Sequence, residues 1–298
     1  MGLESAIITF PILRLSMNPP RFISIFGFNI YLYGIIMAAG FLLGMLYLLK
    51  RHAALGITRE TVFDMVLLAI PSGIIGSRIY YVIFNPSEFF GASGRWQDIF
   101  NVRLGGLAIY GGVLGAAVAF FVYSRIKKVP MSKLADAGAF GLFIGQIVGR
   151  WGNFINREAF GVETTGPWRM GLTTAAGTMY VHPTFLYESL WNIVGLIFLH
   201  VFSKKRKVKY NGQLFLIYVA WYGFGRFFIE GLRADSLFLA STNIRASQLL
   251  AALSFAVAVA AMVYNRKRVA SASVINDAPP HKELESLVED SGDTPDDI

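Results

Sequence analysis

Seven long apolar stretches dominate the sequence, at roughly residues 29–49, 62–84, 107–124, 134–154, 186–202, 213–231 and 245–264. Most are close to the roughly 20 residues that an α-helix needs to cross the hydrocarbon core of a bilayer. A hydrophobic fraction of 54% and a mean hydropathy of +0.51 also lie outside the range of soluble domains. We therefore expect an all-α polytopic membrane protein with about seven transmembrane helices and a small extracytoplasmic loop region.

Basic residues gather in four connecting segments and predict the orientation of these helices. The clusters follow the first, third, fifth and seventh stretches: Lys50, Arg51 and Arg59; Arg125, Lys127, Lys128 and Lys133; Lys204, Lys205, Arg206, Lys207 and Lys209; and Arg266, Lys267 and Arg268. Because Lys and Arg are enriched on the cytoplasmic side of membrane proteins, these segments are expected in the cytoplasm together with the C-terminus. The N-terminus and residues 85–106, 155–185 and 232–244 then face outward.

The chain divides into three expected regions. Residues 1–28 are an extracytoplasmic or interfacial lead-in, because they lack the basic start and unbroken apolar core of a signal peptide. Residues 29–265 form one membrane domain. Residues 266–298 form a cytoplasmic tail, and the part after Asn276 holds eight of the 19 acidic residues but one of the 27 Lys and Arg. This composition predicts disorder from about residue 269 and favours a solvating role over partner binding.

Charge and cysteine content exclude two classes of function. The basic residues lie in short clusters between apolar segments, which is typical of membrane topology and argues against a nucleic-acid partner. The chain has no cysteine, so it has no disulfide, no thiolate metal site and no thiol nucleophile of its own. Any thiol chemistry must belong to a substrate.

Polar residues interrupt the apolar pattern at the end of the fourth stretch, in the run GRWGNFINREAFG from Gly149 to Gly161. Gln146, Arg150 and Asn153 are spaced so that they share one face of a helix. The predicted topology places this run at the outer face of the membrane. A single arginine there is typical of an interfacial anchor whose charged end reaches the headgroups.

A second polar stripe lies at the end of the sixth stretch, in the run YGFGRFFIEGLRADS. Tyr222, Arg226, Glu230 and Arg233 fall within an arc of about 80° on one helix face. Their spacing allows an intrahelical network of Arg226, Glu230 and Arg233, which leaves one arginine in surplus. Charged residues in a membrane helix usually face the protein interior. Together with Arg150, this surplus favours binding of a phosphate group, which arginine recognises through paired hydrogen bonds.

These motifs carry a resemblance to a known family. The run GRWGNFINREAFG resembles the signature of the prolipoprotein diacylglyceryl transferases. Further blocks resemble family blocks in the family's order over about residues 25–265: Tyr31-Leu32-Tyr33-Gly34, Gly76-Ser77-Arg78-Ile79-Tyr80-Tyr81, GGLAIYGGVLG from Gly105 to Gly115, HPTFLYE from His182 to Glu188, and YGFGRFFIEGLR from Tyr222.

The resemblance implies an enzyme of the bacterial cell membrane whose active site faces the extracytoplasmic side. Such an enzyme transfers the diacylglyceryl group of phosphatidylglycerol to the lipobox cysteine thiol of prolipoprotein signal peptides, forming a thioether and releasing glycerol phosphate. No metal or organic cofactor is implied. The matching positions are Arg150, Asn153, Glu158, Gly161, Tyr33, Tyr222, Arg226, Glu230 and Arg233. We expect Arg150 and Arg226 to stabilise the departing phosphate, Glu230 and Arg233 to orient them, and Asn153 and Glu158 to fix the headgroup.

The general base for the thiol stays open. Much of the family has histidine before two glycines, whereas this chain has Tyr110 in IYGGVLG. Tyrosine, with an ordinary pKa near 10, is a poorer base at neutral pH than histidine near 6.5. Tyr110 either takes part in catalysis or mainly positions lipid. The alternative bases are water, Glu158 and, as a runner-up, His182.

Two other functions fit parts of the pattern. A transporter for an anionic or phosphorylated solute would also keep arginines in the membrane, but repeated halves and broken helices are typical of transporters and neither is evident in the sequence. A seven-span receptor or scaffold would explain the helix count but not the arginine-rich stripes.

Overall fold

The computed structural model describes residues 3–91, 94–102, 105–205, 208–239, 242 and 244–276. Within these residues, seven long helices each coincide with one of the apolar stretches: α1 (Leu32–Arg51), α2 (Arg59–Phe84), α4 (Ile109–Lys127), α5 (Met131–Asn156), α6 (Thr184–Lys204), α7 (Gln213–Gly231) and α8 (Ala246–Asn276). Shorter helical segments lie between or before them: α3 (Pro86–Phe90) and the 3-10 turns Leu3–Ser5, Pro11–Leu13, Ala53–Leu55 and Trp96–Phe100.

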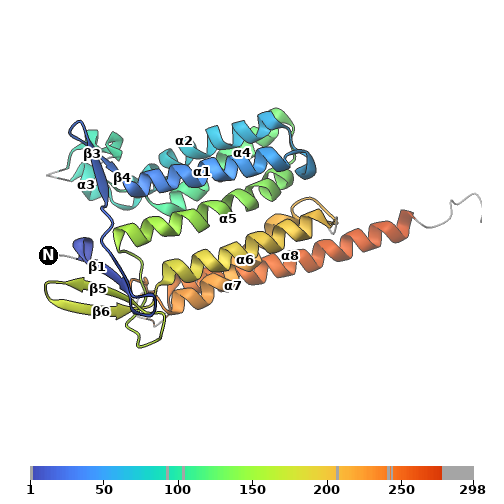
Figure 1. Ribbon diagram of the computed structural model, residues 1–298. Helices are drawn as coiled ribbons and strands as arrows, with labels where there is room; N and C mark the ends of the chain where they lie inside the picture. The colour runs from blue at the N-terminus through green and yellow to red at the C-terminus, as the bar shows by residue number, and fades with distance from the viewer. Residues whose placement is uncertain are drawn as a thin grey trace, which may run out of the picture.

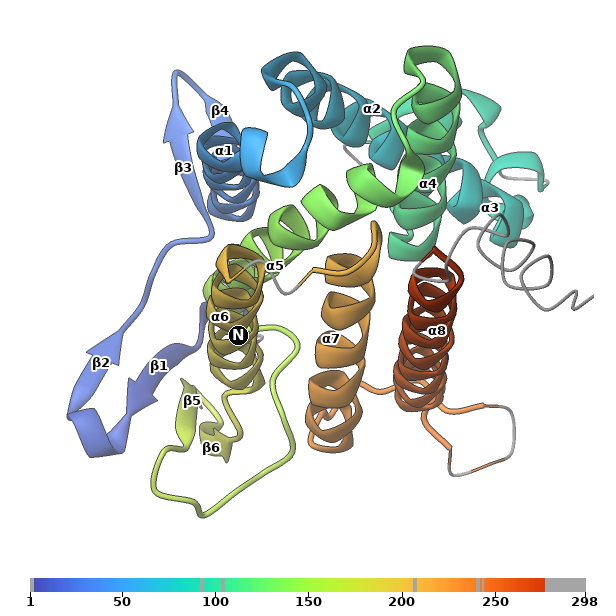
Figure 2. The same ribbon diagram turned by 90° about the vertical axis from the view of Figure 1, so that its right-hand side faces the viewer.

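The long helices pack side by side, with α5 between two groups (Figures 1 and 2). On one side α1 packs against α5 and α2 against α4; on the other, α6 and α7 pack against α5, and α8 packs against α7. This central place brings α5 into contact with both α6 and α7. The three helices that carry the polar motifs are therefore neighbours.

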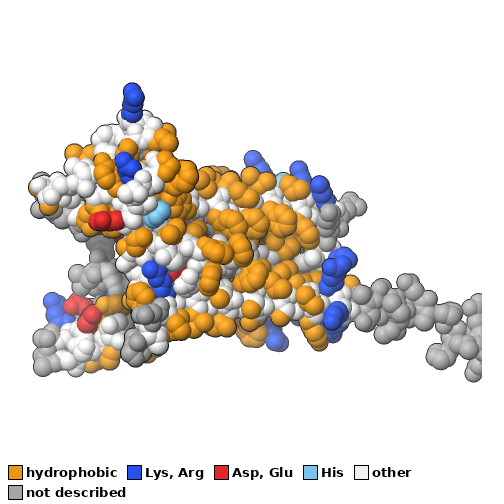
Figure 3. All heavy atoms as spheres, turned by 90° about the horizontal axis from the view of Figure 1, so that it is seen from below, with side chains coloured by type: hydrophobic (Ala, Val, Ile, Leu, Met, Phe, Trp, Pro, Cys, Tyr) orange, Lys and Arg blue, Asp and Glu red, His pale blue; other side chains and the backbone are white. Residues whose placement is uncertain are grey.

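The face of the helix bundle seen in Figure 3 is apolar along the length of the helices. Large apolar side chains are exposed on the long helices, such as Leu67 at 69% and Ile126 at 70%. An apolar surface of this extent requires lipid, because monomeric soluble proteins rarely expose such patches to water. By length and composition α1, α2, α4, α6 and the Ala246–Val269 part of α8 are candidate membrane spans, so the chain is a polytopic membrane protein. Helices α5 and α7 are not among these candidates: α5 carries Lys133, Asp136 and Arg150, and α7 carries Arg226 and Glu230.

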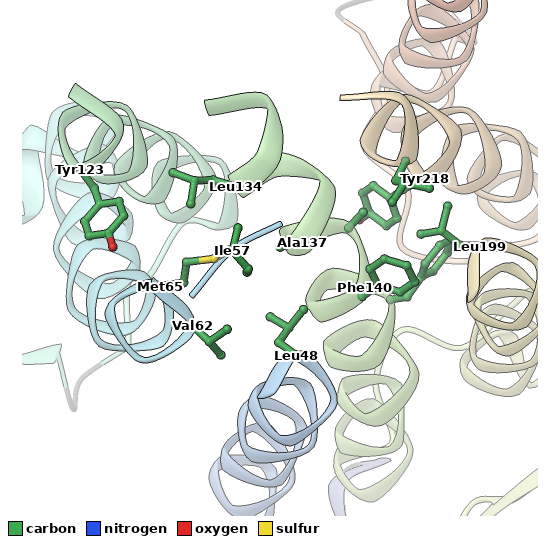
Figure 4. Packing of buried hydrophobic residues seen from close by; sticks show 13 residues of the cluster. Leu48, Ile57, Val62, Met65, Tyr123, Leu134, Ala137, Phe140, Leu199 and Tyr218 are labelled. Atoms are coloured by element: carbon green, nitrogen blue, oxygen red, sulfur yellow. The ribbon is translucent and has the colours of Figure 1, made fainter. Parts of the chain in front are cut away.

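A buried cluster fixes the first turns of α5 against its neighbours. Figure 4 shows Leu48, Val62, Leu199 and Tyr218, from four other helices, arranged around Phe140 and the adjoining turns of α5. Asp136 adds a polar connection, because its Oδ2 accepts a hydrogen bond from the Gly212 N–H at 2.7 Å and its Oδ1 accepts one from the Phe215 N–H at 2.9 Å. These bonds satisfy N–H groups at the start of α7, which have no partner within that helix. They fix the position of α7 along α5.

Two small sheets correct the expectation of an all-α protein. Strands β1 (Ile7–Phe10), β2 (Leu15–Met17), β5 (Met170–Thr174) and β6 (Gly177–Val181) form an antiparallel sheet in the order β2-β1-β5-β6. Strands β3 (Phe22–Ile25) and β4 (Phe28–Tyr31) form a hairpin. Strands of three to five residues are too short for their side-chain alternation to stand out in a sequence. The β1–β5 pairing also joins segments more than 150 residues apart, as in Ile8 opposite Leu172.

Arg157 ties the lead-in to the end of α5. The residue follows α5 with a left-handed backbone, at φ 55°, and its side chain is buried. Its guanidinium donates hydrogen bonds to Ala6 O, Asn18 Oδ1 and Pro19 O at 2.6–2.9 Å, and to Ile155 O. The lead-in and the segment after α5, both expected at the outer face, therefore lie together at the same end of the bundle.

The basic clusters within the described residues lie at the other end, at the C-termini of α1, α4 and α6, at the N-termini of α2 and α5, and within the C-terminal part of α8. Helix α8 extends through Asn276, and disorder of the tail stays a prediction. The rest of the expected tail, residues 277–298, lies outside the described residues.

Candidate active site

The last turns of α5 present Arg150 and Asn153 side by side, as their spacing predicts. Arg150 Nη1 donates to Asn153 Oδ1 at 3.1 Å, and Asn153 Nδ2 donates to Glu158 Oε1 at 2.8 Å. Glu158 is exposed just beyond the helix, where it also accepts a longer bond of 3.4 Å from Asn156. The three predicted residues of this run thus form one hydrogen-bonded series from the helix to the surface.

The stripe on α7 forms part of the predicted intrahelical network. Arg226 Nη2 lies 2.6 Å from Glu230 Oε2, and Arg233 Nε lies 4.0 Å from the same oxygen. Helix α7 ends at Gly231, so Arg233 belongs to the following turn rather than to a continuing helix face. Glu230 is 2% exposed and also accepts a hydrogen bond from the Ser236 hydroxyl at 2.9 Å.

Glu188 of α6 joins the two motifs, and the sequence reasoning missed it. Arg150 Nη2 lies 2.6 Å from Glu188 Oε1, and Arg226 Nη1 lies 3.0 Å from Glu188 Oε2. The Tyr222 hydroxyl donates to Glu188 Oε1 at 3.3 Å. The carboxylate is only 2% exposed. A glutamate inside an apolar stretch was the available signal, because a charge there is usually paired within the protein.

The surplus of one arginine predicted from the spacing is not found, because Arg233 has an acidic partner of its own. Arg233 donates to Asp235 through Nε at 2.9 Å and Nη2 at 2.7 Å, which is a two-pronged contact. These bonds hold the pKa of the Asp235 carboxyl below its ordinary value. Arg150 and Arg226 likewise face Glu188 and Glu230. The three arginines are therefore balanced by three carboxylates, and the expected excess of positive charge is wrong. An anion would be recognised through the N–H groups of the arginines rather than through net charge.

Tyr33 and Gly161 lie close to these motifs through tight packing. A Cβ at Gly152 would lie 2.5 Å from the Tyr33 ring, so the missing side chain lets α1 place Tyr33 against the turn that carries Arg150. At Gly161 a Cβ would lie 2.8 Å from Leu232 O. Gly161 pairs with Arg233 as an isolated β-bridge. This glycine allows the chain after α5 to lie directly against the turn after α7.

Tyr110 and His182 are not joined to this network among the described residues. Tyr110 lies in the first turn of α4 and is 47% exposed, and its ring lies 6.5 Å from that of Tyr80, centroid to centroid. His182 Nδ1 lies 3.1 Å from the Tyr187 hydroxyl. No group of three or more His, Cys, Asp or Glu side chains that could hold a metal ion is found in the described part of the chain.

Comparison with known proteins gives a consistent result. The sequence model of the family "Prolipoprotein diacylglyceryl transferase" matches residues 20–264. The chain is 42% identical over 245 residues to the phosphatidylglycerol–prolipoprotein diacylglyceryl transferase of Clostridioides difficile (strain 630), covering 82% of this chain and 94% of that protein. It is 39% identical to the enzyme of the same name from Enterococcus faecalis, covering 82% and 89%. The corresponding Listeria innocua protein is 40% identical, covering 84% and 91%.

Proposed function

The chain belongs to the prolipoprotein diacylglyceryl transferase family and has that family's transferase activity, and on this premise we propose that the cluster of Arg150, Glu188 and Arg226 is where the donor phosphatidylglycerol reacts. The observation that carries this assignment is the convergence of two arginines, from α5 and α7, on one buried carboxylate of α6. The transporter alternative has no comparable support.

The arginines bind the phosphate, and Glu188 positions them. A guanidinium has five N–H donors, and the contacts in this cluster leave part of each set free. By contacting both arginines, the Glu188 carboxylate holds the guanidinium groups of Arg150 and Arg226 next to each other. In a site shielded from water, donors held in place in this way stabilise the charge that develops on a departing phosphate. Asn153 and Tyr222 extend the hydrogen-bonding surface on either side of Arg150.

The acceptor is the lipobox cysteine thiol of a prolipoprotein signal peptide. Its sulfur attacks the glycerol carbon of the diacylglyceryl group that bears the phosphate ester. The C–S bond forms while the C–O bond breaks, and the electron pair of that bond leaves with glycerol phosphate. The thiol proton must pass to a base, because the thiolate is the reactive nucleophile.

Glu158 is the proton acceptor in this proposal. It is the exposed end of the hydrogen-bonded series that begins at Arg150. Tyr110 lies outside that series and instead positions lipid. His182 is engaged with Tyr187. Exchange of Glu158 for Gln should lower the rate of transfer, because it removes the carboxylate that accepts the thiol proton, whereas exchange of Tyr110 for Phe should leave the rate largely unchanged.

The reaction takes place at the extracytoplasmic face of the bacterial cell membrane. All seven long helices cross the bilayer in this proposal, including α5 and α7, because apolar neighbours on both sides shield their charged residues from lipid. The basic clusters at the opposite end of the bundle support a cytoplasmic location for that end.

Transfer from labelled phosphatidylglycerol to a lipobox peptide tests the assignment directly. With purified protein in bilayer discs, Arg226→Ala should lower kcat/KM by about 100-fold or more, since losing one pre-positioned donor to developing charge typically costs that much. Arg226→Lys should restore little, because lysine lacks the paired donors. Arg169→Ala is the matched control, as Arg169 lies in the segment after α5 and donates to Thr165 O away from the cluster. Full transfer by folded Arg226→Ala protein would refute the proposed role of Arg226.

A further inference from the structure

A second polar layer lies one helical turn below the arginine cluster, on the side away from the sheets. It consists of Gln146 of α5, Asn192 of α6 and Tyr218 of α7, which lie four residues along their helices from Arg150, Glu188 and Tyr222. Gln146 Nε2 donates to the Tyr218 hydroxyl at 2.8 Å. Tyr218 is 6% exposed, and Figure 4 shows it beside Leu199 and Phe140. One turn corresponds to about 5.4 Å along a helix.

Amide atoms in this layer have no hydrogen-bond partner among the described residues. Asn192 is fully buried, at 0% exposure, and both its Nδ2 and its Oδ1 are unpartnered there. Gln146 Oε1 is buried and unpartnered in the same way. Burying a polar group without a partner is costly, so such atoms in a folded protein usually meet a ligand or an ordered water.

Asn192 lies on the face of α6 that contacts α5 and α7, as Glu188 of the arginine cluster does. Glu188, Asn192 and Gly195 are spaced by four and three residues and share one face of α6. Glu188 contacts Arg150 and Arg226 at one end of this face. At the other end, a Cβ on Gly195 would meet side chains from both α5 and α7. Asn192 lies between these two points and therefore faces the junction of α5 and α7.

We propose that Asn192 and Gln146 bind the two acyl ester carbonyls of the donor lipid. This inference rests on the proposed function, which places the lipid phosphate at the arginine cluster. In a glycerophospholipid the ester carbonyls lie on the acyl-chain side of the phosphate, and the amide layer lies on the interior side of the arginines. Ester carbonyls only accept hydrogen bonds, and a side-chain amide supplies N–H donors.

Both amides can present a donor to the lipid. Asn192 Nδ2 is already free of protein partners among the described residues. Rotation of the Gln146 amide lets the Tyr218 hydroxyl donate to Oε1, which frees Nε2, and the two orientations of an amide differ only in where its O and N lie. Two amides then match two carbonyls. The diacylglyceryl group is thereby held through its ester carbonyls, which stay part of that group in the product.

Ether-linked phosphatidylglycerol separates this contact from the chemistry, because the bond that breaks joins glycerol to phosphate and no ester takes part. A neutral hydrogen bond contributes about fivefold to binding, so wild-type protein should prefer the diacyl donor over the dialkyl donor by about 25-fold in kcat/KM. Asn192→Leu, which keeps a similar volume, should reduce this preference to about fivefold. Gln146→Met should have the same effect and decides the question if the first variant does not fold.

Ser189→Ala is the matched control, because Ser189 is buried beside Glu188 on α6 and its hydroxyl donates to Ile147 O at 3.1 Å. This variant alters the contact between α5 and α6 but should keep the 25-fold preference for the diacyl donor. An unchanged preference in both amide variants, or equal use of the two lipids by wild-type protein, overturns the proposal and assigns the amides to buried water.

Thermal stabilisation by each lipid, measured on the same samples, separates the two proposals. Tighter binding of the diacyl lipid without any transfer would support the ester contact while contradicting the proposed function. Transfer with no difference between the two lipids, in binding or in rate, would support the proposed function while contradicting the ester contact.

Discussion

Replacement of Glu188 by Gln tests how the site positions its arginines. The substitution keeps the shape of the side chain but removes the charge that contacts Arg150 at 2.6 Å and Arg226 at 3.0 Å. A glutamine can accept through one oxygen, while its amide nitrogen faces a guanidinium that also donates. At least one of the two arginines therefore loses its fixed orientation, and the cluster gains one positive charge.

The magnitude follows from these contacts. A hydrogen bond to a charged group contributes about 1.5–3 kcal/mol. Weakening the two contacts should therefore reduce the free energy that holds the arginines in place by about 3 kcal/mol. We expect kcat to fall by about 100-fold, which corresponds to that free energy. KM for phosphatidylglycerol should stay the same or fall, because the added positive charge favours the anionic lipid. A residue with only a structural role would lower the amount of folded protein without separating kcat from KM in this way.

The assay is steady-state transfer to a lipobox peptide over a range of phosphatidylglycerol concentrations in bilayer discs, with thermal unfolding measured on the same samples. Glu163→Gln is the control, because it makes the same chemical change at an exposed position outside the cluster. If folded Glu188→Gln protein keeps the wild-type kcat, or loses activity only through a higher KM, Glu188 does not position the arginines.

Three further perturbations address the surroundings of the site. Arg157→Ala removes the bonds from Arg157 to the lead-in and should lower stability by about 3 kcal/mol; thermal unfolding and protease cleavage within the first 28 residues would detect it. Gly161→Ala would place a Cβ 2.8 Å from Leu232 O, so we expect the turn that carries Arg233 to shift and transfer to fall by about tenfold, with lipid-free stability as the second readout. The pKa of Asp235 is lowered by Arg233, so its contribution to stability is present above the unfolded-state pKa of about 3.9 and is lost as the pH falls through the lower folded-state value. The stability difference between wild type and Asp235→Asn should therefore be constant from about pH 5 to 8 and shrink in more acidic solution, and a difference that changes near neutral pH would contradict this assignment.

The helices and the two polar motifs could be predicted from local pattern. A continuous apolar stretch of about 20 residues has few alternatives to a helix in lipid, because every backbone N–H and C=O must be satisfied within the segment. Periodicity then showed which residues share a face, as Arg226 and Glu230 do on α7 and Arg150 and Asn153 do on α5. The resemblance to the transferase family rested on those same residues and agrees with the comparisons.

Contacts between helices could not be predicted in the same way, since periodicity fixes a face but not the neighbour it meets. Glu188 was missed because its importance depends on α6 lying against both α5 and α7. The predicted surplus of one arginine did not take Asp235 into account, because Asp235 contacts Arg233 only after α7 has ended. The four-stranded sheet was missed because β1 and β5, which are far apart in the sequence, become strands only when they pair with each other.

Local features of the sequence were enough to predict a helical membrane protein with two arginine-bearing polar motifs, because hydrophobicity, charge clusters and helical spacing act over short stretches of chain. How those groups meet depends on the packing of the helices. The packing of α5, α6 and α7 turns separate stripes into one cluster around Glu188, leaves Tyr110 outside it, and places the Asn192 amide below it. Side chains from different helices combine through the rotation and relative height of those helices, which are set by core packing and by contacts such as Asp136 with the start of α7.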